Sequence, residues 1–348
     1  MCKSKLLTGL VIAAILLTAV MILPSCMRQE QATIELRLAH FFPATHPAET
    51  VLVQQWAKAI DEATGGKVKI VSYPGEQLLK SADIYNGVVE GVTDIGLSCF
   101  AYTPGRFPVL EAFELPGITY LNSRAASMVA WKGIQALNPP EVQDTQLLMV
   151  IATGPGDLFT KTPVKSLADL QGMEIRATGL SAETIKLLGG TPVGMPQSET
   201  YDALSKGVVK GNLAPVEVLK GWKHAEVTRY ITETPFLYNT LFFVTINKAK
   251  WAAIPADLRS KILTVTAAFH EDTAAGLWDM QNEAAMTYAL DEQKMEIFSL
   301  SETETALWIE KVMPIQEAYQ KKLSDQGITA DPLKTIGELA AQYNDLYK

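Results

Sequence analysis

Cysteine is scarce in this chain of 348 residues, with three in all. Cys2 and Cys26 lie in an N-terminal segment that we expect to be processed, so Cys99 stands alone and no intrachain disulfide is expected. We interpret Cys99 as a small buried apolar residue. Stability must then come from a hydrophobic core, which a chain of this length with 48% hydrophobic residues can supply.

Positive charge is also in short supply. The chain has 30 Lys and Arg residues against 38 Asp and Glu residues, a formal net charge of −8 at pH 7. This balance gives no electrostatic support to a nucleic-acid partner. It is ordinary for a soluble globular protein, and the length allows two domains.

The motifs of common enzyme classes are missing. There is no H-E-x-x-H, no P-loop and no dinucleotide fingerprint, and residues 179–183 (GLSAE) fail the G-x-S-x-G pattern at their last position. Neither His224 nor His270 pairs with a nucleophile. His40 and His46 share one loop, but no third ligand is nearby, so we expect no metal site. The sequence therefore predicts neither catalysis nor a cofactor.

A long apolar run occurs once, at the N-terminus. Lys3 and Lys5 precede residues 6–23, and Cys26 follows directly after Leu-Pro-Ser. A basic region, an apolar core and small residues before a cleavage point indicate a secretory signal, here residues 1–25. A cysteine at that point resembles a bacterial lipobox and predicts lipid on Cys26. An uncleaved membrane anchor and plain secretion are the alternatives, and all three place the folded part outside the cytoplasm.

The rest of the chain repeats one alternation of short strands and helices. The first set has strands near residues 34–38, 68–73 and 93–98, with helices over 49–64 and 82–90. The second set has strands near 173–175 and 191–195 and one from 208, with helices that we expect Ser181 and Ser198 to cap. This alternation is typical of parallel sheets with covering helices and predicts an α/β fold. Two such sets suggest two similar lobes that share a crevice.

We expect a tether over residues 26–32 and then two lobes. The first lobe takes residues 33–153 with about 242–275, and the second takes 154–241 with about 276–348. Apolar residues recur at helical spacing from Pro255 to about Gln293. One helix of that length approaches 60 Å at roughly 1.5 Å per residue and would lie across both lobes. The alternative is two helices that are broken at Gly276.

Arg176 is the first candidate for a ligand-binding residue. It stands at the C-terminal end of a predicted strand, and open parallel sheets bind ligands beyond the carboxyl ends of their strands. Its planar guanidinium matches a carboxylate or a phosphate. The helix that follows would aim free N–H groups at the same place. From position alone, an ordinary ion pair at the surface explains Arg176 equally well.

Five stretches carry a resemblance to a known family. They are residues 163–176 (PVKSLADLQGMEIR), 195–204 (MPQSETYDAL) with 207–209 (GVV), 73–78 (YPGEQL), 91–96 (GVTDIG) and 251–255 (WAAIP). The chain resembles the solute-binding proteins of tripartite ATP-independent periplasmic (TRAP) transporters, of the dicarboxylate-binding DctP type. The resemblance covers Leu36 to about Tyr343.

This resemblance implies a two-lobed periplasmic-binding-protein-like fold with a ligand cleft between the lobes and a long helix spanning both. It implies a periplasmic protein, held at the membrane by its lipid, that closes on a small organic acid. The ligand passes to a small and a large integral membrane subunit, with transport driven by an ion gradient. The family's arginine that pairs with the substrate carboxylate falls on Arg176.

The sequence departs from the family's sialic-acid binders at several positions. Gly156 lies near the place of their second arginine, Gln197 replaces a usual aromatic residue, and Ala214 replaces an amide that often touches ligand. One arginine thus remains while polar partners become fewer. A pocket with one charge and aromatic walls suits a monocarboxylate with an apolar or aromatic group. The alternatives are that the rings only pack in the core, or that the ligand is a short dicarboxylate.

The predicted ligand-binding residues share positions at strand ends or in the matching motifs. They are His40, Phe42, Tyr102, Arg176, Gln197, Tyr201, Pro215, Tyr238 and Phe242. We interpret Trp222, on a helix after Pro215, as a core residue. A ligand-sensing role for a receptor is the other function that the same fold could serve.

Overall fold

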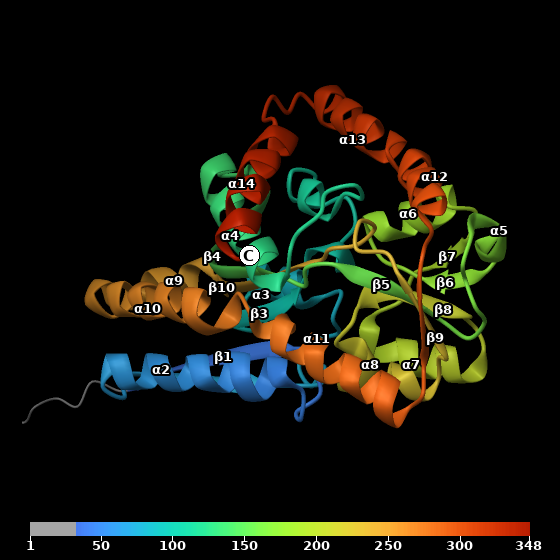
Figure 1. The fold of residues 1–348 in the computed structure, drawn as a ribbon. Coiled ribbons are helices and arrows are strands. Elements are labelled where there is room, and N and C mark those ends of the chain that lie inside the picture. Colours follow the sequence, from blue (N-terminus) through green and yellow to red (C-terminus); the bar gives the residue numbers. More distant parts are fainter. Residues whose placement is uncertain (1–32) are drawn as a thin grey trace, which may run out of the picture. The chain divides into compact units, whose positions relative to one another are not determined.

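Two mixed β-sheets carry the fold in the computed structural model, which describes residues 33–348 (Figure 1). The predicted signal peptide, the tether and Cys26 lie outside the described residues. No helix of residues 33–348 is long and apolar enough to span a membrane.

The first sheet has five strands in the order β2-β1-β3-β10-β4. These are β1 (Ile34–His40), β2 (Val68–Tyr73), β3 (Ile95–Cys99), β4 (Thr145–Ala152) and β10 (Leu241–Asn247). Strand β1 is parallel to β2 and β3, as the sequence predicts, and β10 lies antiparallel between β3 and β4.

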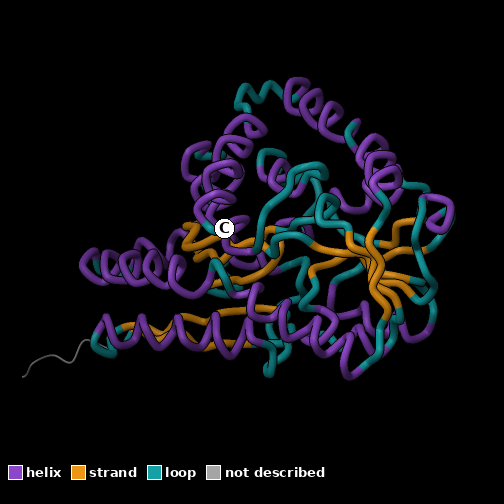
Figure 2. The backbone as a smooth tube through the Cα atoms, in the orientation of Figure 1, coloured by secondary structure: helices purple, strands orange, loops and turns teal. Residues whose placement is uncertain are grey.

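The second sheet has six strands in the order β11-β9-β5-β8-β6-β7. These are β5 (Gly156–Thr160), β6 (Glu174–Arg176), β7 (Thr191–Val193), β8 (Gly211–Pro215), β9 (Tyr230–Glu233) and β11 (Glu296–Ser299). Strand β6 is parallel to β7 and β8, and β5 is antiparallel to β8 and β9. Figure 2 shows these strands gathered apart from those of the first sheet, so the α/β prediction is confirmed.

Amphipathic helices cover the first sheet. They are α2 (Gln54–Thr64), which continues a π-helical turn over Ala48–Val53, α3 (Ile84–Glu90), α4 (Ser123–Leu137) and α9 (Lys248–Ala253). Helix α2 buries Trp56 and Ile60 on its inner face and ends where Gly65 takes a φ of 63°. A residue without a Cβ reaches this left-handed conformation at little cost, as the Gly-Gly pair predicts.

Four helices accompany the second sheet: α5 (Leu167–Leu170), α6 (Leu180–Leu187), α7 (Gln197–Lys206) and α8 (Val218–Gly221). The predicted caps of α6 and α7 are wrong, because the N-cap residues are Gly179 and Pro196. Each helix starts earlier than predicted, so Ser181 and Ser198 fall in the first turn. The hydroxyl of Ser181 instead bonds the backbone of Thr178.

The chain passes between the two sheets from β4 to β5, from β9 to β10, and along α10 (Ala256–Phe269) and α11 (Leu277–Thr287). Helix α10 packs on α2 and α11 packs on α8, so this helical run reaches both sheets (Figure 1). The run is broken at Gly276, so the alternative of two helices is confirmed and the single continuous helix is wrong. The backbone there packs against Arg124, whose Nη2 would lie 2.8 Å from an added Cβ.

Three helices close the chain: α12 (Glu302–Val312), α13 (Pro314–Asp325) and α14 (Pro332–Leu346). Helix α14 lies against α4, beside the first sheet (Figure 1). The sequence predicts this part of the chain in the second lobe, and for α14 that prediction is wrong. The predicted lobe boundaries otherwise stay a prediction.

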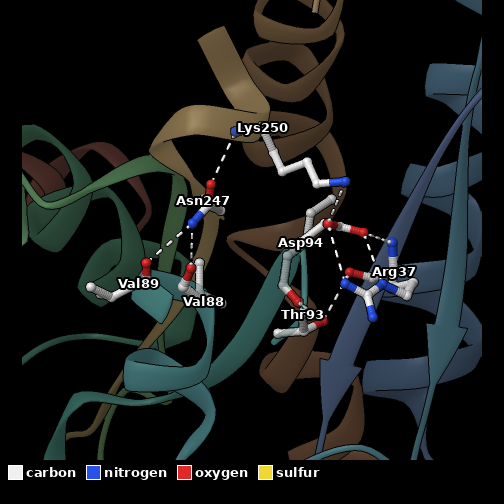
Figure 3. Close-up of polar contacts among 8 residues, drawn as sticks. Arg37, Val88, Val89, Thr93, Asp94, Asn247 and Lys250 are labelled. Atoms are coloured by element: carbon white, nitrogen blue, oxygen red, sulfur yellow. Dashed lines mark hydrogen bonds and ion pairs between the residues drawn. The ribbon is translucent and has the colours of Figure 1, made fainter. Parts of the chain in front are cut away.

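A buried carboxylate just before β3 ties strand β1 to helix α9 (Figure 3). Asp94, 1% exposed, accepts hydrogen bonds from Arg37 N at 2.9 Å and Arg37 Nε at 3.1 Å, and its Oδ1 lies 3.3 Å from Lys250 Nζ. Burial alone would raise the pKa of Asp94, but the bonds from Arg37 and Lys250 hold the pKa below its ordinary value. Nearby, Asn247 caps α9 and bonds the end of α3.

Replacing Asp94 with Asn should lower the free energy of unfolding by about 2 kcal/mol, because the amide cannot serve both cations. The depressed pKa means that this stabilisation is present above the unfolded pKa of an Asp and is lost as the pH falls. Denaturant unfolding at pH 7 measures the change. The matched control is Asp202→Asn, whose exposed pair with Lys206 should contribute almost nothing. Equal effects of the two substitutions would contradict the prediction.

Candidate functional site

A small cavity of about 20 Å³ lies between loops of the two sheets. Its lining residues come from widely separated parts of the chain. They are Phe41, Phe42, Cys99, Tyr102, Arg176, Thr178, Gln197, Pro215, Glu217, Val218, Trp222, Tyr238, Thr240 and Phe242.

The topology explains why these residues meet. Strands β1 and β3 of the first sheet are parallel, and so are β6 and β8 of the second. The cavity is lined by residues at or just beyond the carboxyl ends of all four strands, where open parallel sheets bind ligands. The antiparallel strand β10 adds residues from its start, including Phe242. The strand-end rule therefore holds in both halves of the protein.

Arg176 is 2% exposed and is held in place from two sides. Its Nε donates to Met195 O at 3.0 Å, and its Nη2 lies 3.4 Å from the Tyr102 hydroxyl. Its Nη1 makes no hydrogen bond within residues 33–348. The alternative that Arg176 is a surface ion pair is wrong, because it is buried and has no acidic partner among the described residues. A guanidinium has five N–H donors, so donors remain for a bound anion.

Aromatic rings form one side of the cavity. The rings of Phe41 and Phe42 stack with centroids 4.3 Å apart, and Phe242 lies 5.7 Å from Phe42. Trp222 lies 6.1 Å from Phe41, and Tyr102 meets Phe41 edge to face at 5.4 Å. The rings thus pack against each other and line the cavity at once, and a ligand-binding role for them stays a prediction. Such a wall offers a planar apolar group stacking and edge contacts.

Gly156, which the resemblance places near the second arginine of the sialic-acid binders, packs against Tyr238. An added Cβ on Gly156 would lie 2.5 Å from Tyr238 Cδ1 and 2.6 Å from Ala214 O. Position 156 therefore has no room for any side chain while the tyrosine ring is there. Because burial raises the pKa of Tyr238, its hydroxyl is neutral and adds no charge. This leaves Arg176 as the single cation among the described lining residues.

Gln197 holds the base of the site with its backbone and its side chain. Its N–H donates to the Tyr102 hydroxyl at 3.0 Å, and its Nε2 lies 2.9 Å from Nε2 of the buried His224. Burial, with the nearby charge of Arg176, lowers the pKa of His224 to about 3, so this imidazole is neutral. On its other side the ring meets the Asn212 amide at 3.2 Å. A neutral polar network thus supports the residues around Arg176 without adding a competing charge.

Two predicted site residues lie outside the cavity. His40 is buried behind it, with Nε2 2.7 Å from Glu49 Oε2 and Nδ1 accepting from Phe42 N. It can therefore orient the Phe42 backbone but does not line the cavity. Tyr201 faces outward on α7, where its hydroxyl bonds Glu226. Its prediction followed the matching motif, which says nothing of the helix face.

Seven predicted residues do line the cavity: Phe42, Tyr102, Arg176, Gln197, Pro215, Tyr238 and Phe242. Three functional candidates were missed, and Phe41, beside Phe42 in the lining, is the first. Trp222 lines the cavity and is not a simple core residue, and its buried Nε1 has no partner in the described chain. Glu217 lies two residues after β8, where the strand-end rule could have found it.

A second, larger cavity adjoins the first. Tyr102 and Thr178 border both cavities, and the second extends over the loop from Thr103 to Leu110 and past Gly179 to Lys322. Its one deeply buried acid is Glu114, which accepts from Leu241 N at 2.8 Å. Burial raises the pKa of Glu114 to about 8. Among the described residues that line this second cavity the only cation is Lys322, and it pairs with Glu111 at the rim, so none is free for a carboxylate.

Most of the chain matches a known protein family. Residues 38–322 match the family described as bacterial extracellular solute-binding protein, family 7, named DctP. The chain belongs to this family. Its members are solute-binding proteins of transporters and not enzymes.

Solved structures agree with this assignment. A TRAP solute-binding protein from a marine metagenome, specific for aromatic acid ligands and crystallised with 3-hydroxybenzoate, is 32% identical, with a TM-score of 0.84 over 90% of this chain and 99% of that one. One from Rhodoferax ferrireducens, in complex with copurified benzoate, is 30% identical, with a TM-score of 0.83 over 91% of this chain and all of that one. The two-lobed fold of TRAP solute-binding proteins is thereby confirmed.

A curated relative shows that ligands differ within the family. The C4-dicarboxylate-binding periplasmic protein DctP of Rhodobacter capsulatus is 28% identical over 276 residues, which are 78% of this chain and 82% of that protein. The family therefore identifies a solute-binding protein of a TRAP transporter but leaves its ligand open.

Proposed function

We propose that this TRAP solute-binding protein captures an aromatic or otherwise apolar monocarboxylate. The observation that carries the proposal is the single buried cation, Arg176, in a cavity with an aromatic wall. A second carboxylate would have no cation to meet among the described lining residues, and burying it unpaired is costly. The two aromatic-acid complexes among the relatives support the same ligand class.

The mechanism follows from where the lining residues lie. Arg176 and Gln197 come with the second sheet, and Phe41, Phe42 and Tyr102 come with the first. We propose that the ligand carboxylate binds the free edge of the Arg176 guanidinium and that the lobes close over its apolar part. Closure expels water, which strengthens the ion pair by lowering the local dielectric. The closed protein then delivers its ligand to the small and large integral membrane subunits.

The N-terminal features belong to the same proposal. We propose a periplasmic protein with its signal removed before Cys26 and a lipid on that cysteine. The lipid would hold the folded part near its membrane partners. Mass spectrometry of the protein purified from membranes tests this, because the lipidated form begins at Cys26 and carries the added acyl mass.

A ligand screen tests the proposal directly. Benzoate, phenylacetate, an aliphatic monoacid and succinate are compared by thermal shift, since a ligand raises the melting temperature by mass action. We expect the aromatic monoacids to shift the melting temperature and succinate to leave it unchanged. Calorimetry then gives the affinities. Binding of succinate without binding of the aromatic acids would contradict the aromatic proposal and favour a short dicarboxylate.

A further inference from the structure

Glu217 is the second charged residue of the cavity, and the proposed function does not use it. It is 4% exposed and lines the same cavity as Arg176. The other twelve lining residues carry no charged side chain, because burial raises the pKa values of Cys99, Tyr102 and Tyr238 and keeps them neutral.

His46, from the loop after β1, makes a hydrogen bond to one carboxylate oxygen of Glu217. His46 Nε2 lies 3.0 Å from Glu217 Oε2, and Ala48 N donates to His46 Nδ1 at 3.0 Å. Because Nδ1 accepts a hydrogen bond, the ring proton must sit on Nε2, which then donates to the carboxylate. This tautomer is neutral, so His46 orients Glu217 but does not cancel its charge.

The position of Glu217 is fixed by close packing. An added Cβ on Gly221 would lie 2.6 Å from Glu217 Oε2 and 2.8 Å from His46 Nε2. The helix backbone at Gly221 therefore covers this oxygen, and the His46 ring stacks on Phe42 with centroids 4.8 Å apart. Glu217 Oε2 is thus enclosed by the helix backbone on one side and by His46 on the other.

Its second oxygen, Oε1, has no hydrogen bond within the part of the chain that the structure describes. This oxygen keeps some contact with solvent where Glu217 lines the cavity. A ligand that fills the cavity without offering a donor would leave the oxygen and its charge unpaired, which is costly. A ligand whose only polar group is a carboxylate would satisfy Arg176 and worsen the surroundings of Glu217. A ligand that also carries a hydrogen-bond donor would satisfy both side chains.

We propose that Glu217 Oε1 accepts a hydrogen bond from a hydroxyl or ammonium group on the ligand, at a distance from its carboxylate. The inference rests on the proposed function, because it assumes that Arg176 binds that carboxylate. It makes the ligand a hydroxylated or amino-substituted aromatic acid and makes Glu217 the residue that selects it. The unpartnered indole N–H of Trp222 in the same lining favours a hydroxyl, which can donate to Glu217 and also accept.

The wild-type protein provides the first test. Calorimetry compares benzoate, the three hydroxybenzoate isomers, the matching methoxybenzoates and the aminomethylbenzoates. We expect at least one hydroxybenzoate or aminomethylbenzoate to bind about tenfold or more tightly than benzoate, because a charge-assisted hydrogen bond is strong in a dry site. Its methoxy counterpart keeps the oxygen and loses the donor, so it should lose this gain. Comparing the hydroxybenzoates with the aminomethylbenzoates shows whether the donor is a hydroxyl or an ammonium group.

The substitution Glu217→Gln provides the second test. Its amide oxygen can still accept from His46, which protects the packing, while the charge is lost. We expect the ratio between the preferred donor-bearing acid and benzoate to fall from about tenfold to below about threefold. Benzoate itself should bind more tightly, because a like charge has left the cavity. Glu226→Gln removes the same charge from an exposed position and should leave the wild-type ratio.

The outcomes separate the two proposals. If no aromatic acid binds the wild type, the proposed function fails and the inference fails with it. If benzoate and every donor-bearing acid bind equally, the function stands and the role of Glu217 is overturned. A preference for donors that survives Glu217→Gln also overturns it, because another residue then makes the selection.

Discussion

Replacing Arg176 with Lys should weaken binding of an aromatic monocarboxylate at least about tenfold, and Arg176→Gln should weaken it at least about a hundredfold. Lysine keeps the charge but loses the planar fork that can meet both carboxylate oxygens. It also loses the Nε donor that now bonds Met195 O and fixes the plane of the group. Glutamine removes the only cation among the described lining residues, which leaves the buried ligand charge unpaired.

Calorimetric titration with benzoate measures both substitutions. Arg229→Lys is the control, because Arg229 is exposed and does not line the cavity. Its Nη1 donates one hydrogen bond, to Gln293 O. We expect wild-type affinity for the control and unchanged melting temperatures without ligand for Arg176→Lys. Near-wild-type affinity of Arg176→Gln would remove Arg176 from the binding site.

Replacing Glu114 with Gln should stabilise the protein by about 3 kcal/mol at pH 7. The pKa of Glu114 is raised to about 8 in the folded protein by burial, from an ordinary value of 4.5. Between pH 4.5 and about 8, Glu114 is protonated in the folded protein and ionised in the unfolded chain. The free energy of unfolding therefore falls as the pH rises through this window. A glutamine has no proton to hold, and its amide oxygen can still accept from Leu241 N.

The stabilisation by Glu114→Gln should grow as the pH rises from 5 to 8. Below pH 4.5 the carboxyl group is protonated in both states, so the difference between wild type and Glu114→Gln should shrink toward that pH. Denaturant unfolding at pH 5, 6, 7 and 8 gives the series, with the exposed Glu310→Gln as the control. A difference that stays constant across the series would show that Glu114 keeps an ordinary pKa.

Much of the fold could be predicted because local signals and global pattern agree. The turn at Gly65, the strand that ends at Arg176 and the break at Gly276 all follow from backbone rules that act over a few residues. The start of a helix is less certain, because one residue of shift turns an expected cap such as Ser181 into a member of the first turn. That shift depends on packing and not on the local sequence.

In the candidate site, too, features with a local sequence signal could be predicted and contacts between distant residues could not. Strand ends identified Arg176 and the aromatic loop after β1, because parallel strands bring their carboxyl ends together, while Pro215 came from the matching motif. The contact of His46 with Glu217 joins residues 171 apart, and the cover that Gly221 provides depends on a helix backbone. Neither has a signal in the sequence, since both arise only when the loops of the two sheets meet.

A crystal structure of the protein with the best-binding aromatic acid of the screen tests the central claim most directly. The account predicts the carboxylate within hydrogen-bond distance of the Arg176 guanidinium and the ring among Phe41, Phe42, Trp222 and Phe242. A ligand seated in the adjoining cavity beside Thr103 and Leu110, with no contact to Arg176, would contradict it.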